Sequence, residues 1–382
     1  MNSYRPVIMG TRHAVAAGHY LAAEAGFDVL NNGGNAIDAG VASGLAIGVL
    51  QSDIVNIAGV APTILWIAEE QKTINIDGLG HWPRALPQDY FQREHDGAIP
   101  EGILRTVVPA APASWLWALE RYGTMSFADV AQYAIRYARD GFPMYPLLQE
   151  NIAIDIENYR RWPSSAEVYL PGNRPPEVGD VFIQAELGKS LQYMADEEAG
   201  KTHDGREAGI RAARDAFYKG DIARKFAQYH ADNGGFLTYD DMANYEVRVE
   251  PTVKTSVGGI ELHCCGPWSQ GPLLSQTLRL LEGYDLKSMS HNSAEYIHVL
   301  VEALKLSCAD RERYYGDPNF VDVPMTQLLS DDYTALRRSL IRDDTAWPEM
   351  PPPGDPVNGK ATTAPGPAIP PPASIPKDIR EP

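Results

Sequence analysis

The stretch AIDAGVASGLAIGVL, residues 36–50, constrains the fold of this chain more than any other. It is an apolar run of about fifteen residues, too short to cross a bilayer. The run is rich in glycine and is interrupted by Asp38. Small side chains let a helix approach a neighbouring layer of structure closely. The run therefore predicts a helix in the interior of a globular protein.

A second helix is expected just before this one. Between residues 14 and 30, apolar side chains such as Leu21 and Ala25 recur at helical spacing. The sequence NNGGN, residues 31–35, then supplies glycines that can end this helix, and Asn35 can cap the next. Two helices in tandem are therefore expected.

Strand patterns lie before and after a long helical region. The segment PTILWIAEEQKTINIDGL holds two β-branched runs around a polar turn at residues 69–72, as in a hairpin. A second pair of strands is expected within residues 247–265, joined by Gly258 and Gly259. Helices are expected at residues 112–122, 126–140, 147–159, 186–195, 210–218 and 220–232, and in the segments PLLSQTLRLLEGY and SAEYIHVLVEALKLSCADRERYYG. This order predicts a layered α+β protein.

Length and charge limit the classes of protein that the chain can belong to. At 382 residues, 44% of them hydrophobic, it can form one large domain or two ordinary ones. The formal net charge is -17, and the acidic residues are spread along the chain. Such a chain repels polyanions, so no nucleic-acid partner and no anionic membrane partner are expected.

The N-terminus and the cysteines indicate a reducing compartment. The sequence MNSYRPVIMG lacks the features of a secretory signal, so a cytoplasmic protein is expected. Cys264, Cys265 and Cys308 cannot form a disulfide framework, and the adjacent pair does not have a zinc-site spacing. We interpret them as reduced thiols, in preference to a nucleophilic cysteine.

Familiar catalytic and cofactor motifs are absent from the sequence. It contains no GxGxxG, no P-loop and no GxSxG elbow, and NNGGN is interpreted as a turn between helices. No cofactor is therefore expected. His298 and Glu302, four residues apart, could share a metal ion, but no third ligand accompanies them. We expect no metal site there.

The composition changes after about residue 343. Residues 347–382 are rich in proline and have almost no periodic apolar pattern. We expect residues 1–343 to form the folded domain and residues 344–382 to form a flexible tail.

Several segments resemble the γ-glutamyltranspeptidase family, in the family's order. The first, EAGFDVLNNGGNAIDAGVASGLAIGVL, is similar to the family's long N-terminal signature. It is followed by RYGTMSFADVAQYAIRYARDGFP, AFYKGDIARKFAQY, GGFLTYDDMANYEV, GPWSQGPLLSQTLRLLEGYDL and ADRERYYGDPNF. The resemblance covers roughly residues 6–340.

The resemblance implies an αββα sandwich of the N-terminal-nucleophile hydrolase type, made as a proenzyme that cuts itself. The chain would be the large subunit, ending at the cleavage site after Pro382. The nucleophile would be an N-terminal threonine, which combines a hydroxyl and a basic amine. It is expected on the small subunit, so no catalytic residue is expected in this chain. The implied partner is that small subunit, in a heterodimer or a dimer of heterodimers.

The loop INIDGLGHWPRALPQDYF, residues 74–91, departs from the family pattern. In the transpeptidases that it resembles, a Phe-Arg-Glu motif follows this strand, and its arginine holds the glutamyl α-carboxylate. Leu79 takes the arginine's position here and cannot make that pair. Upstream, the family's run of glycines becomes IAGVAP, which keeps only Gly59. A different acyl pocket is therefore expected.

Four residues are candidates for substrate binding: Leu79, His81, Arg84 and Arg105. Trp82 could line the same pocket, and either arginine could serve as a replacement carboxylate partner. An arginine in a loop is, alternatively, often simply solvated.

Three functions remain open at this stage. The first is an amide hydrolase or acyltransferase acting on a small acyl amide, with oxamate-type amides and glutaryl side chains as candidates by family analogy. The second is a true γ-glutamyltransferase or glutathione hydrolase. The third is a non-catalytic binding or scaffold subunit.

Overall fold

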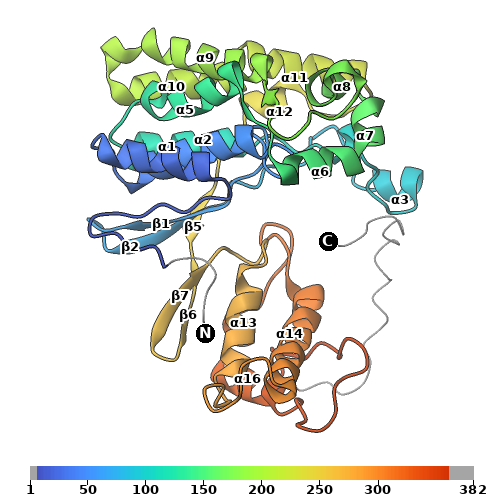
Figure 1. Ribbon diagram of the computed structural model, residues 1–382. Helices are drawn as coiled ribbons and strands as arrows, with labels where there is room; N and C mark the ends of the chain where they lie inside the picture. Colours follow the sequence, from blue (N-terminus) through green and yellow to red (C-terminus); the bar gives the residue numbers. More distant parts are fainter. Residues whose placement is uncertain (1–6, 361–382) are drawn as a thin grey trace. The chain divides into compact units, whose positions relative to one another are not determined.

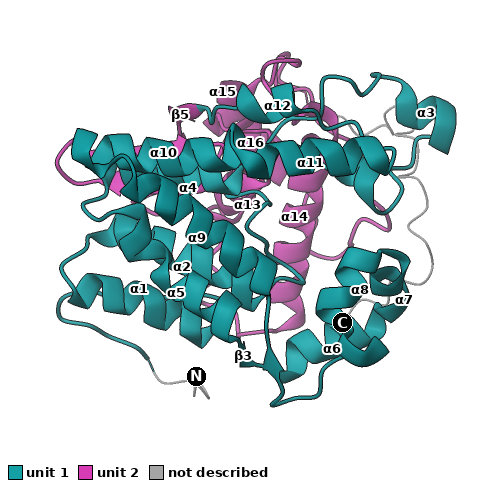
Figure 2. Cartoon of the chain, turned by 90° about the horizontal axis from the view of Figure 1, so that it is seen from above, with its two compact units in different colours: residues 1–62, 78–248 teal, residues 63–77, 249–382 magenta. Residues whose placement is uncertain are grey.

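The computed structural model describes residues 7–360, and the chain divides into two compact units (Figure 2). Unit 1 comprises residues 1–62 and 78–248, and unit 2 comprises residues 63–77 and 249–382. The chain thus leaves unit 1 for a short hairpin, returns, and leaves again. Residues 1–343, for which the sequence predicts one domain, are shared between both units.

Unit 1 begins with the predicted helix pair, α1 (Tyr20–Asn31) and α2 (Ala36–Leu50). Asn35 caps α2 by accepting hydrogen bonds from the amides of Ile37 and Asp38, and the Asp38 carboxylate accepts from the Asn35 amide in return. Asp38 is fully buried and also accepts from the Thr124 amide and hydroxyl. This carboxylate therefore joins the start of α2 to the loop before α5.

The small residues of α2 allow the close packing that the sequence predicts. A Cβ placed on Gly44 would lie 2.9 Å from the Trp115 ring, and one on Gly48 would lie 2.8 Å from Ile57. Helix α2 packs against α1, α4 and α5, and α5 packs against α9, which packs against α10 (Figure 1). The core of unit 1 thus lies between successive layers of helices.

The remaining elements of unit 1 agree with most of the sequence predictions. The helix expected at residues 147–159 is interrupted at Asp155 and forms two helices, α6 and α7. The helical elements are α3 (Tyr90–His95), η1 (Ile103–Arg105), α4 (Ala111–Tyr122), α5 (Phe127–Asp140), α6 (Pro146–Ile154), α7 (Ile156–Arg161), α8 (Pro163–Tyr169), η2 (Pro171–Asn173), α9 (Ala185–Ala199), η3 (Thr202–Asp204), α10 (Arg206–Tyr218), α11 (Asp221–Asp232) and α12 (Tyr239–Ala243). Strands β3 (Phe142–Pro143) and β4 (Val181–Phe182) pair antiparallel.

Unit 2 contains the predicted hairpins. Strands β1 (Thr63–Ile67) and β2 (Lys72–Ile76) pair antiparallel, with Thr63 opposite Ile76. Strand β5 (Val249–Pro251) adds to the other edge of β2, which gives the order β1-β2-β5. Strands β6 (Val253–Val257) and β7 (Ile260–Cys264) form a separate hairpin. The second strand region, expected as one pair, is therefore three strands in two sheets.

The helices of unit 2 are α13 (Gly271–Leu281), α14 (Ala294–Tyr314), α15 (Met325–Leu328) and α16 (Asp331–Arg338). Ser293 caps α14 by accepting from the Tyr296 amide, and Ser330 caps α16 in the same way. Apolar side chains of α13 and α14, including Leu281 and Leu306, form the core of this unit.

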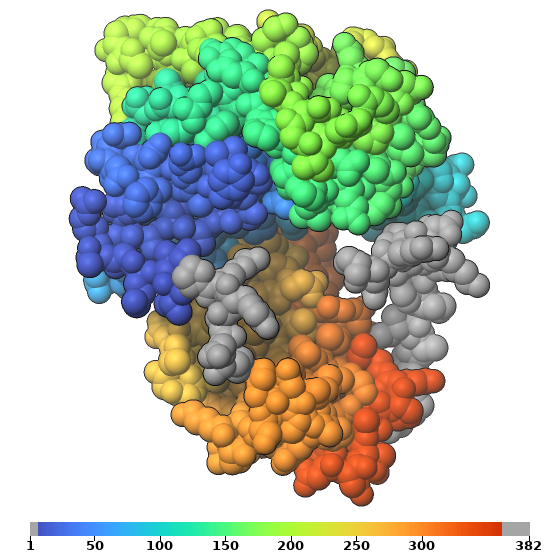
Figure 3. All heavy atoms as spheres, viewed as in Figure 1, coloured from blue at the N-terminus to red at the C-terminus, as the bar shows by residue number. Residues whose placement is uncertain are grey.

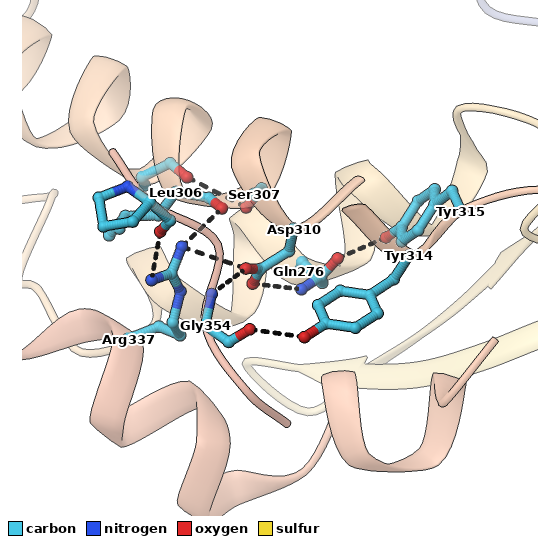
Figure 4. A network of polar contacts seen from close by, with 10 residues as sticks. Gln276, Leu306, Ser307, Asp310, Tyr314, Tyr315, Arg337 and Gly354 are labelled. Carbon is cyan, nitrogen blue, oxygen red and sulfur yellow. Dashed lines mark hydrogen bonds and ion pairs between the residues drawn. The ribbon is translucent and has the colours of Figure 1, made fainter. Parts of the chain in front are cut away.

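A buried polar network holds α14, α16 and the following segment together (Figure 4). The guanidinium of Arg337 lies 3.1 Å from Asp310 Oδ1, and both residues are 1% exposed. Arg337 also donates to the Pro352 carbonyl at 3.1 Å. Asp310 accepts from the Gly354 amide at 2.9 Å, and the Tyr314 hydroxyl donates to the Gly354 carbonyl at 2.7 Å. Burial raises the pKa of Asp310 and outweighs the opposite effect of Arg337.

Residues 344–360, predicted to begin a flexible tail, are held in place in unit 2. Besides the contacts of Pro352 and Gly354, the Trp347 amide donates to Glu302 Oε2 at 3.0 Å. Lys305 Nζ donates to the Trp347 carbonyl at 2.6 Å. The expectation of a flexible segment is corrected for this part, because buried groups of α14 and α16 bind its backbone. Residues 361–382 lie outside the described residues.

Candidate functional site

The loop that follows β2 is fixed by two glycines with positive φ. Gly78 has φ +46° and Gly80 has φ +82°. A Cβ on Gly78 would lie 2.2 Å from the Ala61 carbonyl oxygen, and a Cβ on Gly80 would lie 2.3 Å from the Val108 carbonyl oxygen. A side chain at either position would therefore clash with backbone as well as strain φ. The Phe-Arg-Glu motif of the family would place side chains at both positions.

Leu79 lies between these glycines and is 39% exposed. The loop around it is held by two backbone hydrogen bonds, from the Ala61 amide to the Gly78 carbonyl and from the Val108 amide to the His81 carbonyl, both at 2.8 Å. Leu79 thus presents an apolar side chain from a fixed backbone. It offers no hydrogen-bond donor to a carboxylate.

The strand before the loop is fixed within unit 2. Asn75, fully buried in β2, donates to Glu250 Oε1 at 3.0 Å across the pairing with β5. The indole of Trp268 donates to the same oxygen at 2.6 Å. These bonds fix β2 within the three-stranded sheet of unit 2.

His81 rests on a buried pair of tyrosines. Its ring meets the Tyr245 ring edge-on at 5.5 Å, and Tyr245 stacks on Tyr218 at 5.8 Å. The Tyr218 hydroxyl donates to the Pro109 carbonyl at 2.6 Å and accepts from the Ala113 amide at 3.1 Å. Burial raises the pKa of Tyr218, so it stays neutral. His81 itself is exposed.

Arg84 is anchored by its backbone and leaves its guanidinium available. Its amide donates to Asp241 Oδ1 at 3.2 Å, and Asp241 also forms the capping box of α12 with Thr238. Within residues 7–360, the Arg84 side chain is exposed and has no ion pair or hydrogen bond. This arginine can therefore receive a carboxylate from outside the chain.

Arg105 is already engaged in its own loop. Its Nε donates to the Pro100 carbonyl at 3.1 Å, and its Nη2 donates to the Ile99 carbonyl at 3.3 Å. In the described part of the chain, no hydrogen bond, ion pair or ring contact joins it to Leu79, His81 or Arg84. It could bind a carboxylate only with its remaining donors or by giving up these bonds.

Trp82 packs against the aromatic residues of α3. Its ring lies 5.7 Å from the Phe91 ring of α3, and Tyr90 meets Phe236 at 4.9 Å in the same aromatic cluster. Trp82 is still 44% exposed. It therefore links the loop to α3.

The residues that sequence reasoning missed are those that position the loop. Asp241 and Tyr245 come from the segment GGFLTYDDMANYEV, whose sequence indicates the family resemblance and no contact with the loop. The paired glycines of DGLG were a visible signal, since glycine is favoured wherever φ is positive. The sequence does not indicate that Gly78 lies against the Ala61 carbonyl or that Gly80 lies against the Val108 carbonyl; these contacts arise only in the folded chain.

Metal and membrane sites find no support in the described residues. Among residues 7–360, no three His, Cys, Asp or Glu side chains gather in a way that could hold a metal ion. His298 Nε2 contacts the Arg342 carbonyl at 2.7 Å, and Glu302 pairs with Lys305. In the same range, no helix is long and apolar enough to cross a membrane.

Comparison with solved structures defines the class of protein. The crystal structure of Helicobacter pylori γ-glutamyltranspeptidase superposes with a TM-score of 0.83 and 28% identity, over 91% of this chain and 97% of that chain. The fold is therefore that of the N-terminal-nucleophile hydrolases, which confirms the fold class predicted from the sequence.

Comparison of sequences then identifies the family. The sequence model of γ-glutamyltranspeptidase matches residues 22–367, and the chain belongs to this family. It is 33% identical to the glutathione hydrolase-like YwrD proenzyme of Bacillus subtilis (strain 168), over 85% of this chain and 59% of the relative. It is also 33% identical to the Acylase ACY 1 proenzyme of Pseudomonas sp. (strain SE83), over 88% of this chain and 60% of the relative. The chain thus spans about 60% of these relatives' length.

Proposed function

We propose that this chain is the large subunit of an autoprocessed amide hydrolase or acyltransferase. The nucleophile is an N-terminal threonine on a small subunit from the same precursor, and the two subunits form a heterodimer. The family membership, the proenzyme names of two relatives and the share of their length that the chain spans support this proposal. The three cysteines, free in the structure, suit the cytoplasm as its location.

The reading frame and the processed product test this part of the proposal. The frame after the codon for Pro382 is expected to continue with a threonine codon, and the purified protein is expected to contain a second fragment whose N-terminal residue is that threonine. A stop codon directly after Pro382, with no small subunit encoded elsewhere, would favour the non-catalytic scaffold. A second fragment that begins with another residue would contradict the threonine nucleophile.

The substrate is proposed to be a small acyl amide that is bound without the usual grip on a γ-glutamyl α-carboxylate. Leu79 is the observation that carries this step, because it stands at the position of the arginine in the resembled motif. Losing a charge-assisted clamp in a desolvated pocket costs roughly 2–5 kcal/mol. The glycines on both sides of Leu79 favour a loop built differently from the Phe-Arg-Glu motif. The similarity to an acylase proenzyme points in the same direction.

Arg84 is the stronger of the two candidates for a replacement carboxylate partner. Its guanidinium is exposed and unpaired within the described residues, whereas that of Arg105 is bonded to its own loop. An arginine fork can bind a carboxylate in two parallel hydrogen bonds. This favours an acyl group whose carboxylate is placed differently from the α-carboxylate of a γ-glutamyl group, since glutaryl carries its carboxylate at the same position as γ-glutamyl.

A true γ-glutamyltransferase or glutathione hydrolase with a displaced clamp is the second candidate, favoured by the similarity to a glutathione hydrolase-like proenzyme and to a γ-glutamyltranspeptidase. Turnover of a γ-glutamyl anilide and of a glutaryl anilide separates the two, since the latter lacks the α-amino group. The acylase proposal expects the glutaryl compound to be turned over at least as well. Efficient turnover of the γ-glutamyl compound alone would favour the second candidate.

A further inference from the structure

A second cavity in unit 1 lies apart from the loop of Leu79. It has a volume of about 700 Å³ and is formed by η1, the α7–α8 corner and α11. Its apolar walls are Ile103, Trp162, Phe226 and Tyr229. The segment of residues 146–169 lies at the surface of unit 1 (green in Figure 3). The volume and lining are typical of a small-molecule site.

The walls of this cavity are held in fixed positions. Trp162 packs against Gly102, where a Cβ would lie 2.7 Å from the indole ring. Gly102 has φ +98°, so the backbone there also favours glycine. On the opposite wall, Phe226 packs against the core of unit 1, while Tyr229 is 42% exposed.

A largely buried histidine lines the cavity and has one ring nitrogen without a partner in the described residues. His230 lines it and is only 3% exposed. Its Nδ1 accepts from the Leu237 amide at 3.4 Å, so the neutral ring carries its proton on Nε2. Burial lowers the pKa of His230, which keeps the ring neutral. No group in residues 7–360 accepts a hydrogen bond from Nε2. Nε2 is not among the buried polar atoms that lack a partner, so it is open to the cavity, where the acceptor of a ligand can replace water.

The orientation of the His230 ring is fixed by its surroundings. A Cβ on Gly235 would lie 2.1 Å from Nδ1, so the Gly235 backbone packs directly against the ring. The Gly235 amide also donates to the His230 carbonyl at 2.8 Å. The Nε2 proton is therefore held in one direction.

A cation lies at the rim of the cavity. Lys225 is exposed and has no ion pair within the described residues, although its charge acts on the Glu186 carboxylate at the same rim, which is paired with Lys189 at 2.6 Å. Lys225 and His230 are five residues apart on α11, so they are separated by roughly 7.5 Å along the helix axis. Around the helix axis, Lys225 and His230 are turned by about 140° from one another, and Phe226 and Tyr229 lie in the arc between them.

We propose that this cavity binds a flat aromatic molecule with an uncharged carbonyl at one end and a carboxylate at the other. The ring lies between Trp162 and the aromatic side chains of α11, the carbonyl accepts from His230 Nε2, and the carboxylate meets Lys225. This site goes beyond the acyl-transfer function proposed above and uses none of its residues.

Three probes and isothermal titration calorimetry on the purified full-length protein test the proposal. The first, 4-acetylbenzoate, has the ring, the carbonyl and the carboxylate. The second, 4-ethylbenzoate, lacks the carbonyl, and the third, 4-methylacetophenone, lacks the carboxylate. We expect 4-acetylbenzoate to bind about tenfold more tightly than 4-ethylbenzoate, as one hydrogen bond that replaces a bond to water would give. Failure of 4-acetylbenzoate to show saturable binding would overturn the proposal.

Two variants assign the contacts. His230→Phe keeps a flat ring and removes the donor, so it should abolish the preference for 4-acetylbenzoate over 4-ethylbenzoate. Lys225→Gln, an exposed change that leaves the core intact, should weaken both carboxylates about two- to fivefold and leave 4-methylacetophenone unchanged. Lys219→Gln, which removes the same charge outside the cavity, should change nothing. If Lys225→Gln binds 4-acetylbenzoate as the wild type does, or if His230→Phe keeps the preference, the site is not the one proposed.

Discussion

At the scale of single residues, Leu79 determines how the acyl group can be held. Leu79→Arg should supply a donor fork for the α-carboxylate and raise kcat/KM for γ-glutamyl anilide by about tenfold to a hundredfold, which corresponds to roughly 1–3 kcal/mol. Turnover of 4-aminobutyryl anilide, the same compound without the carboxylate, should not rise. The measurement is the ratio of the two kcat/KM values in the processed protein.

A matched control for this change is Leu147→Arg. Leu147 is 48% exposed on α6 and has no proposed role, so the same substitution there should leave the ratio unaltered. An unchanged ratio in Leu79→Arg, with normal folding and processing, would mean that Leu79 does not face the substrate.

Gly80 is the residue that we expect to be least replaceable in the loop. Gly80 and Gly97 have nearly the same φ, +82° and +84°, but a Cβ on Gly80 would meet the Val108 oxygen at 2.3 Å, whereas one on Gly97 meets nothing within 4 Å. Gly80→Ala should therefore destabilise the fold by about 1–3 kcal/mol more than Gly97→Ala, because the clash adds to the strain. Urea unfolding measures the difference. Equal losses would show that the loop yields at little cost.

His230 should make stability depend on pH near neutrality. Burial lowers its pKa in the folded state, so between that value and the unfolded value of about 6.5 the unfolded chain binds more protons. The contribution of His230 to the free energy of unfolding is therefore fully present above about pH 6.5 and is lost as the pH falls below that value. His230→Gln should lose less stability than wild type between about pH 7 and pH 5.5. The exposed His203→Gln is the control, and identical pH profiles in all three proteins would refute the expectation.

At the scale of elements, the pair of Asp310 and Arg337 joins α14 and α16 to the segment around Gly354. Asp310→Asn removes one charge of a buried pair and should destabilise unit 2 by about 3–5 kcal/mol. Amides near Gly354 should exchange faster with deuterium, because the Asp310 carboxylate accepts from this segment. The exposed Asp322→Asn should change neither quantity. Retained protection in Asp310→Asn would show that the other bonds suffice.

Elements governed by local pattern were predictable, and those governed by distant partners were not. The hairpin of β1 and β2 follows from alternation and a polar turn, and the capping of α2 follows from Asn35. The break of the 147–159 helix at Asp155 has no glycine or proline to signal it. The pairing of β5 with β2 joins residues far apart in the chain, such as Ile74 and Pro251, and local sequence does not encode that register.

In the candidate site, too, single residues could be predicted from the sequence, whereas their contacts with distant partners could not. The resemblance to the Phe-Arg-Glu motif indicates Leu79, and the charge of Arg84 in the loop after it makes that residue a candidate. That Arg105 bonds to Pro100 and Ile99 depends on the turn of η1, which the sequence pattern did not indicate. The proline-rich composition suggested a free segment after residue 343, yet the buried groups that bind Trp347 and Gly354 come from α14 and α16.

At the scale of the whole molecule, we expect residues 1–382 to need a partner. Within the described residues, β1 and β5 are the outer strands of a three-stranded sheet, and open strand edges promote aggregation. The chain expressed alone should be insoluble or molten, and coexpression with the small subunit should give a soluble complex. Circular dichroism and analytical ultracentrifugation provide the test. A monomeric chain that unfolds cooperatively by itself would contradict this expectation.

The most direct test of the acyl-binding proposal is the ratio of kcat/KM for γ-glutamyl anilide to that for 4-aminobutyryl anilide in the processed wild-type protein. Without an arginine at position 79, removing the α-carboxylate should cost little, so the ratio should lie within about threefold of one. A preference of more than about a hundredfold for the γ-glutamyl compound would contradict the proposal, because it would require a working carboxylate clamp. Loss of that preference in Arg84→Gln would then place the clamp at Arg84.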